Sequence, residues 1–372
     1  MNAHALRVAI VGAGRAGRVH AVNLVESVRD ATVTAVVDAN GDAAGRLARA
    51  VGVADGAVFG SLAAALAGGL FDAVVITTPT FTHRDLAVAA AGAGKHVFCE
   101  KPMALSVAEC DDMEEAAQQS GVTLQIGFMR RFQPEFVEAK RRIVAGDIGE
   151  PMVIKSLTRG PGLPPPWAWD LRTSNGMLAE VNSHDFDCVR WLVGADLERV
   201  YAETANRKGA ARGVDVADFY DNAVVSLRFA DGAIGTIDGT CPADYGYDAR
   251  VEVLGSEGLL LVGDVRGQPI LELRNRDIGV VGPTHRTWPE RFAEAYRAEM
   301  RAFVRAALDG TAPVATAVDG RAAVRAVLAA NRSWQEERPI MVHGEEAPAR
   351  ARTVEGASGV SGVSGGPVGE GV

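Results

Sequence analysis

The sequence LRVAIVGAGRAG, residues 6–17, decides the fold of the first part of the chain. A short apolar run ends in glycines at positions 12, 14 and 17, and the stretch that follows has the pattern of a helix. Gly12 allows a tight turn, Gly14 lets the backbone approach a bound group, and Gly17 lets the helix pack closely on the strand. The stretch therefore predicts a strand, a glycine turn and a helix whose first amide groups can bind an anion.

This glycine spacing is typical of dinucleotide-binding folds, in which a pyrophosphate lies on the helix N-terminus. The second predicted strand ends at Asp38, 21 residues after Gly17, where a carboxylate can accept hydrogen bonds from the adenosine ribose. Asp38 would repel a 2′-phosphate, so we predict NAD rather than NADP. The alternative is that Asp38 only caps a helix. The predicted cofactor residues are Gly12, Gly14, Arg15, Ala16, Gly17, Asp38, Thr78, His83, Glu100 and Lys101.

The first third of the chain alternates short apolar runs with amphipathic stretches, which is the pattern of an open parallel sheet with helices on both faces. Within it, Ser106 and Gly121 bound one predicted helix as its N-cap and its stop. The pattern predicts an α/β domain of the Rossmann type over residues 1–127. Its predicted strands cover residues 7–11, 33–38, 73–77, 96–99 and 123–127.

After residue 127 the strands become longer and are separated by turns, among them a hairpin at Asp231-Gly232. We predict an α+β domain over 128–344 with a large open, mostly antiparallel sheet and two late helices, at 290–308 and 317–335. An uncovered sheet face predicts a homodimer or homotetramer. The Gly/Ser-rich end, 345–372, is predicted to be a disordered tail. The predicted strands are 151–158, 199–205, 219–229, 233–240, 249–254 and 258–263.

Length and composition exclude several classes of protein. At roughly 150 residues per domain, 372 residues predict about two domains. The formal charge of −9 gives no global positive field for nucleic acid. No run of about 18 apolar residues occurs, so no membrane span is predicted. Four cysteines without a CxxC pair indicate neither a zinc site nor a disulfide framework, and we expect a cytoplasmic protein.

Two turns follow predicted strands at the edge where ligands bind in parallel sheets. In the first, Pro79 turns the chain after Thr78, and His83 stands where the next helix should begin; such a histidine is often only a capping residue. In the second, Lys101 follows the strand HVFC within Glu100-Lys101-Pro102. An ammonium group there can stabilise a developing alkoxide, although a lone lysine in a loop is more often a surface residue.

A possible acid–base pair occurs in the second predicted domain. Glu180 and His184 are four positions apart, so they share one face if the segment is helical. Histidine suits proton removal near neutral pH, and a neighbouring carboxylate can fix its tautomer. The pair could instead be an exposed ion pair, or half of a metal site, for which no third ligand is evident.

Together these motifs resemble the Gfo/Idh/MocA oxidoreductase family, and inositol 2-dehydrogenases most closely. GFMRRFQP (127–134) is similar to the family's segment after the last Rossmann strand. YGYD (245–248) is similar to a family strand that brings a tyrosine to the polyol site, and WPERFAEAYRAEMRAF (288–303) is also similar. The resemblance covers about residues 6–340.

The resemblance implies that Lys101, Glu180 and His184 are the catalytic triad, and that Arg130 and Tyr247 bind substrate; Trp167 is a further substrate candidate, because aromatic faces suit sugar rings. The family usually has Asp where this chain has Glu180, which moves the carboxylate by about 1 Å. Where the inositol enzymes have a polar residue, this chain has Gly160, followed by two tryptophans, 167 and 169. These changes suggest a reshaped pocket, unless the tryptophans only pack beneath a loop.

The function implied is reversible oxidation of a secondary ring alcohol to a ketone with NAD. The expected partner is a small cyclitol or sugar, with an amino-cyclitol or aminoglycoside intermediate as the second choice. In this mechanism His184 accepts the hydroxyl proton, Glu180 orients it and Lys101 stabilises the alkoxide, although Lys101 could itself be the base. Two alternatives from other classes are an NAD-dependent redox glycoside hydrolase and an NAD-binding sensor without catalysis.

Overall fold

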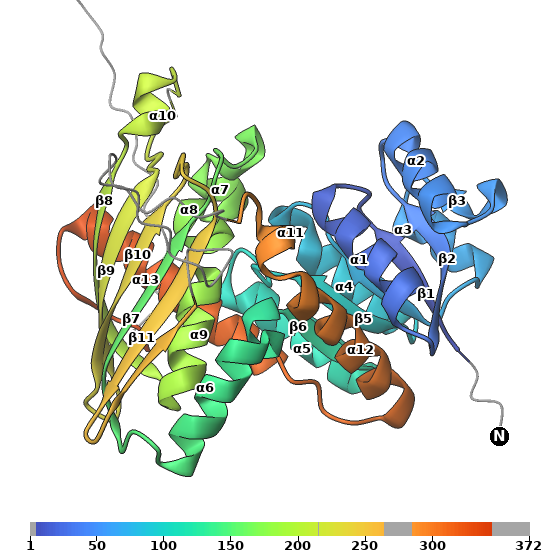
Figure 1. Cartoon of the computed structure of the whole chain (residues 1–372). Helices are drawn as coiled ribbons and strands as arrows, with labels where there is room; N and C mark the ends of the chain where they lie inside the picture. The colour runs from blue at the N-terminus through green and yellow to red at the C-terminus, as the bar shows by residue number, and fades with distance from the viewer. Residues whose placement is uncertain (1–4, 215, 264–284, 344–372) are drawn as a thin grey trace, which may run out of the picture.

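The computed structural model describes residues 5–214, 216–263 and 285–343. The first sheet is six-stranded and parallel, in the order β3-β2-β1-β4-β5-β6. Helices α1 (Arg15–Ser27), α2 (Gly41–Val51), α3 (Leu62–Gly68), α4 (His83–Gly92) and α5 (Val107–Ser120) connect its strands (Figure 1). The predicted doubly wound domain is confirmed. The strands are β1 (Leu6–Val11), β2 (Ala31–Val37), β3 (Val58–Phe59), β4 (Ala73–Ile76), β5 (His96–Glu100) and β6 (Leu124–Gly127).

Local sequence explains most element boundaries in this sheet. Ser106 caps α5 by accepting a hydrogen bond from the Glu109 amide, and Gly121 ends the helix with a φ of 64°. Both features were predicted. The edge strand β3 was not, because two half-buried residues leave no alternating pattern to detect.

The second sheet is seven-stranded, in the order β12-β11-β7-β10-β9-β8-β13. Every neighbouring pair is antiparallel except β7 and β10, so the predicted mostly antiparallel sheet is confirmed. Asp231 and Gly232 form the predicted hairpin between β9 and β10, and the Asp231 side chain accepts from the Ala233 amide. The strands are β7 (Pro151–Arg159), β8 (Leu197–Ala205), β9 (Asn222–Phe229), β10 (Ile234–Thr240), β11 (Asp248–Gly255), β12 (Leu259–Val262) and β13 (Ile340–Met341).

One face of the second sheet is covered by helices α6 (Pro134–Ala145), α9 (Ser183–Val193) and α13 (Ala317–Glu336), which lie between it and the first domain (Figure 1). Short helical elements follow in several loops of the chain: η2 (Thr80–Thr82), η3 (Met129–Phe132), η4 (Pro166–Ala168), α7 (Leu171–Ser174), α8 (Gly176–Glu180) and α10 (Lys208–Ala211). The predicted late helix at 290–308 is divided in two, because Phe292 leaves helical geometry between α11 (Trp288–Arg291) and α12 (Ala293–Asp309).

The hydrophobic core does not follow a boundary at residue 127. Met300 and Phe303 of α12 pack with Val8 and Leu24 in the core of the first sheet, although the sequence assigned them to the second domain. A second core runs continuously from the other face of the first sheet to the large sheet. Residues before and after position 127 therefore build the core of the first sheet together. A domain boundary at residue 127 stays a prediction. The predicted tail, 345–372, lies outside the described residues.

In the described ranges, no helix combines the length and hydropathy needed to cross a bilayer. All four cysteines are buried free thiols.

Candidate active site

The glycine turn has the geometry that a bound pyrophosphate needs. Gly12 has a φ of +103°, and a Cβ there would lie 2.9 Å from the Thr77 carbonyl. A Cβ on Gly17 would lie 1.9 Å from the Gly12 oxygen, so only glycine fits. In contrast, a Cβ on Gly14 would meet nothing within 4 Å, which leaves open space before the N-terminus of α1. These glycines fit a dinucleotide: Gly12 and Gly17 pack closely against the protein, whereas Gly14 leaves space for a pyrophosphate at the N-terminus of α1.

Asp38 lies just beyond β2, beside this turn. Its carboxylate accepts from the Ala13 amide at 2.6 Å and from the Asn40 amide at 2.7 Å. Asn40, rather than Asp38, caps α2. A cavity of about 120 Å³ adjoins the turn and is lined by Ala13, Arg18, Ala43, Arg46 and Leu47. This is the region where the adenosine end of a dinucleotide belongs in the fold.

Arg15 and Ala16 form the first turn of α1. Arg15 is exposed, and its positive charge acts on Cys241 of the second domain. Burial nevertheless raises the pKa of the Cys241 thiol to about 11. A contact between Arg15 and the cofactor stays a prediction.

Thr78 and His83 connect two loops at the edge of the first sheet. The Thr78 hydroxyl pairs with that of Thr82 at 2.6 Å. The buried His83 ring lies 2.8 Å from the Pro102 carbonyl oxygen and 2.8 Å from that of Thr78. A direct cofactor contact for either residue stays a prediction. The structural task of His83 is clear, since it joins the Thr-Pro turn to the loop that carries Lys101.

Lys101 reaches from the first domain to the second. Its ammonium donates to the main-chain oxygen of Glu180 at 2.7 Å. The Glu100 carboxylate beside it accepts from the Lys101 amide at 3.1 Å and contacts the ring of His20 at 2.7 Å. Glu100 is 8% exposed, and each of its oxygens contacts a group of the protein. Its predicted contact with the cofactor stays a prediction.

Among the described residues no hydrogen bond joins Glu180 to His184, so the orienting role of Glu180 stays a prediction. Its carboxylate accepts from the Thr80 hydroxyl at 2.7 Å. The helix is interrupted at Val181 and Asn182, between α8 and α9, so the four-residue spacing does not produce a hydrogen-bonded pair. Burial raises the pKa of the Glu180 carboxyl, although Lys101 and Thr80 oppose that shift.

His184 lies at the start of α9 and is 5% exposed. Its Nδ1 has no hydrogen-bond partner among the described residues, and its ring packs edge-on against Phe128. Burial lowers the pKa of His184 well below its ordinary value, and the charges of Lys101 and Arg130 lower it further. The ring is therefore neutral near pH 7, as a proton acceptor must be.

Arg130 lies in a fully buried network rather than on an open surface. Its guanidinium donates to Asp185 at 2.8 Å, and the hydroxyls of Ser156 and Thr158 bond the same carboxylate. Asn182 donates to Asp185 as well, at 2.8 Å. Sequence reasoning missed Asp185, although it directly follows His184. A substrate contact for Arg130 stays a prediction.

The predicted substrate residues differ in their surroundings. Tyr247 is buried, and burial raises its pKa to about 12. Trp167 packs edge-on against Phe81 of the first domain, with ring centroids 6.2 Å apart, and Phe81 is 48% exposed. Trp169 instead bonds the Pro164 carbonyl and packs against a neighbouring phenylalanine, so it supports the loop. The two tryptophans therefore have different surroundings, and a substrate contact for Trp167 stays a prediction.

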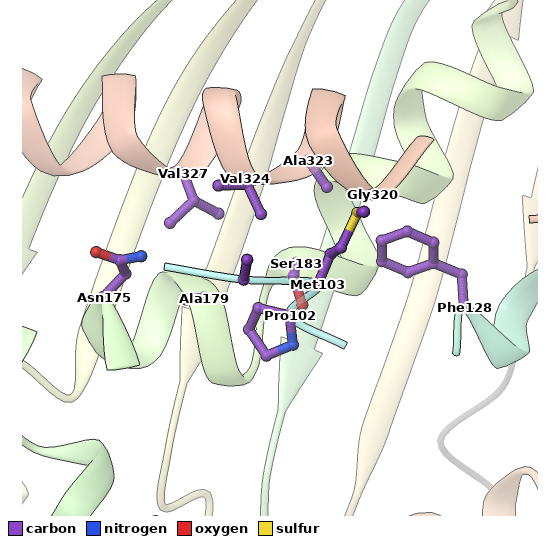
Figure 2. Close-up of a pocket in the computed structure, with 11 residues that line it drawn as sticks. Pro102, Met103, Phe128, Asn175, Ala179, Ser183, Gly320, Ala323, Val324 and Val327 are labelled. Atoms are coloured by element: carbon purple, nitrogen blue, oxygen red, sulfur yellow. The ribbon is translucent and has the colours of Figure 1, made fainter. Parts of the chain in front are cut away.

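Gly160 does not open space directly into the cleft. A Cβ there would lie 3.1 Å from the Cys241 sulfur, so the thiol occupies the place of the missing side chain. A small apolar cavity of about 10 Å³ lies elsewhere, between the Pro102–Ala104 loop and α13 (Figure 2). It has room for about one water and offers few polar groups, so it does not suit a polyol.

Family models match both parts of the chain. Residues 6–128 match the oxidoreductase family with an NAD-binding Rossmann fold, and residues 136–261 match the GFO/IDH/MocA C-terminal domain.

Named relatives match over most of the chain. The chain is 35% identical to scyllo-inositol 2-dehydrogenase (NAD(+)) of Bacillus subtilis, over 91% of this chain and 97% of the relative. It superposes on scyllo-inositol dehydrogenase from Lactobacillus casei, solved with NAD(H) and scyllo-inositol, with a TM-score of 0.82 and 26% identity; 91% of this chain and 100% of that one are covered.

GenD2 from gentamicin A biosynthesis, solved in complex with NAD, superposes with a TM-score of 0.80 at 30% identity, over 91% of this chain and 96% of that one. The two family models, a relative that matches over most of its length and the geometry of the glycine turn all point to the same family. The chain belongs to the Gfo/Idh/MocA family of NAD-dependent oxidoreductases.

Proposed function

We propose that this protein oxidises a secondary ring alcohol of a cyclitol or sugar to a ketone, reversibly, with NAD as cofactor. The observation that carries the proposal is the contact between Lys101 and the Glu180 carbonyl. It joins the strand end of the cofactor domain to the segment that presents His184. An ammonium and a neutral imidazole from two domains then meet in one cleft.

The two groups have complementary tasks. The neutral ring of His184 accepts the proton of the substrate hydroxyl. Lys101 keeps two ammonium hydrogens beyond the one given to Glu180, and these can stabilise the negative charge on the substrate oxygen. Glu180 acts through its main chain, which holds Lys101, and through its bond to Thr80.

Bound NAD supplies the hydride acceptor. In this chain Gly12, Gly14 and Gly17 would hold its pyrophosphate, and Asp38 its adenosine ribose. Gly14→Ala tests this fit, because the unliganded protein has room for the added Cβ. We expect normal thermal stability and at least a tenfold weaker affinity for NAD by fluorescence titration. Gly41→Ala, also unobstructed, is the matched control and should bind NAD normally.

The favoured substrates are inositols, since the relatives named above include scyllo-inositol dehydrogenases. An amino-cyclitol or aminoglycoside intermediate is the second candidate. Trp167 and the exposed Phe81 form an aromatic edge between the domains, and aromatic faces suit the apolar faces of sugar rings. GenD2, from an aminoglycoside pathway, supports the same candidate.

A substrate panel tests the proposal. Myo-inositol, scyllo-inositol and amino sugars are each incubated with NAD, and NADH and free sugar are measured together. NADH formation without bond cleavage supports the dehydrogenase. Sugar release without net NADH would instead identify a redox hydrolase, and NAD binding without turnover across the panel would support a sensor.

We also propose a homo-oligomer in the cytosol. The uncovered face of the large sheet carries exposed Val224, Ile234 and Leu254, interspersed with ion pairs such as Lys155–Glu252. Such a face favours association with a second copy. The four unpaired thiols suit a reducing compartment. Light scattering tests the assembly, and a strictly monomeric mass would contradict it.

A further inference from the structure

A cluster of polar side chains is buried between α1, β5 and α12, and the proposed mechanism does not use it. His20 and Glu299 are both 0% exposed, and Glu100 is 8% exposed. The ring of Tyr296, one turn before Glu299 on α12, lies 5.5 Å from the His20 ring. Polar groups so deeply buried are costly unless they are paired, so the pairing within this cluster is informative.

Each oxygen of Glu100 has its own task. Oε1 lies 2.7 Å from His20 Nε2, and Oε2 accepts from the Lys101 amide at 3.1 Å. An ionised carboxylate only accepts hydrogen bonds, so Nε2 carries the hydrogen of that contact. One carboxylate thus links a histidine on α1 to the backbone of the residue that donates across the cleft.

Glu100 and Glu299 differ in charge. Burial opposes ionisation of Glu100, but the hydrogen bond and charge of His20 hold its pKa below the ordinary value. For Glu299, burial and the Glu100 charge raise the pKa well above the ordinary value, and neither of its oxygens has a partner among the described residues. Burial and the nearby Glu100 charge therefore both favour the protonated form of Glu299. His20 and Lys101 act on the Glu100 carboxylate, and the charge of Glu100 in turn acts on His83, Cys99, Glu180, Tyr296 and Glu299.

We propose that His20 is a positioning residue for the reaction: its Nε2–H keeps Glu100 a carboxylate, and Glu100 fixes the main chain that places the Lys101 ammonium. This inference rests on the role proposed for Lys101. His20 touches neither the reacting centre nor Lys101 directly, and it acts through Glu100 alone.

The expected effect follows from what Glu100 would lose. Without the His20 donor, the buried carboxylate keeps only the Lys101 amide and takes up a proton more readily. The neutral acid is a weaker acceptor, so the Lys101 main chain loses its anchor. A displacement of order 1 Å at a catalytic group can cost about a hundredfold in rate.

Two amide substitutions separate the hydrogen bond from packing. In His20→Gln the amide nitrogen reaches the position of Nε2, whereas in His20→Asn it reaches only that of Nδ1. We expect His20→Asn to lower kcat about tenfold or more with little change in KM for NAD, and to move the acidic limb of the pH profile to higher pH. His20→Gln should restore most of kcat and the original limb.

The matched control is His96→Leu, at the other end of β5, where His96 accepts only from the Thr123 amide. It should lower thermal stability while kcat stays within about twofold of wild type. Equal losses in His20→Gln and His20→Asn, or an acidic limb that does not move in His20→Asn, would overturn the inference. Lys101→Met, assayed in parallel, distinguishes the causes. If it retains turnover, the proposed function fails; if it is inactive while His20→Asn is normal, only the inference fails.

Discussion

His184 and His20 are both buried histidines on helices, yet their surroundings differ. Among the described residues Nδ1 of both rings lacks a hydrogen-bond partner, but Nε2 of His20 lies 2.7 Å from the Glu100 carboxylate. The carboxylate expected beside His184 bonds Thr80 instead. A buried histidine that pairs with a carboxylate can hold that carboxylate in place. A buried histidine near positive charges stays neutral, and a neutral ring is the form that can accept a proton. The variants at His184, Lys101 and Glu180 test the His184 side of this contrast, and the His20 variants described above test the other.

Replacing His184 should have the largest effect. We expect His184→Ala to lower kcat by about 10²–10⁴-fold, because general-base catalysis of this size would be lost. Affinity for NAD, followed by fluorescence, should stay near that of wild type. Full turnover in this variant would show that His184 is not the base.

The next largest effect is expected at Lys101. Lys101→Met keeps the length of the side chain but removes the ammonium that donates to the Glu180 carbonyl. We expect kcat to fall by about 10²–10³-fold, as for loss of an oxyanion donor. Steady-state kinetics provide the measurement, and an effect confined to KM would refute the role in the transition state.

The pH profile tests the electrostatic side of the contrast. Because burial and Lys101 lower the pKa of His184, the base form is present at neutral pH. The acidic limb of kcat/KM should therefore lie below pH ~6.5, the ordinary value for histidine. In the residual activity of Lys101→Met the limb should move to higher pH, since a depressing charge is gone. A shift in the opposite direction would contradict the assignment.

The smallest effect is expected at Glu180. Glu180→Gln preserves the main-chain oxygen that holds Lys101 and an oxygen that can accept from Thr80. We expect kcat to fall less than about tenfold, because no hydrogen bond to His184 is lost. Thr80→Val is the companion variant and should behave similarly. A loss as large as that of His184→Ala would mean that the carboxylate does orient the base.

The sequence predicted the first domain well because its signals are local. The glycine spacing of the turn and the Ser106 cap are recognisable within a few residues of chain, and Asp38 follows at the end of the next long strand. The large sheet and its hairpin were also predictable from strand length and turn residues. The return of α12 to the first domain was not, since nothing in residues 293–309 identifies α1 as the surface that they cover.

Candidate site residues could be named from the sequence, but their hydrogen-bond partners could not. Lys101, Glu180 and His184 could be recognised from resemblance and spacing. The break at Val181 and Asn182 redirects Glu180 to Thr80, which is 100 positions away in sequence. The partners of Arg130 and His20 likewise come from distant segments, so only the folded chain reveals them.

The most direct test measures NADH formation by wild type and by His184→Ala with NAD and each cyclitol of the panel. A dehydrogenase should form NADH with at least one cyclitol or amino sugar, without bond cleavage, and His184→Ala should abolish nearly all of it while still binding NAD. Equal NADH formation by the two proteins, or none by wild type with any of these substrates, would contradict the account.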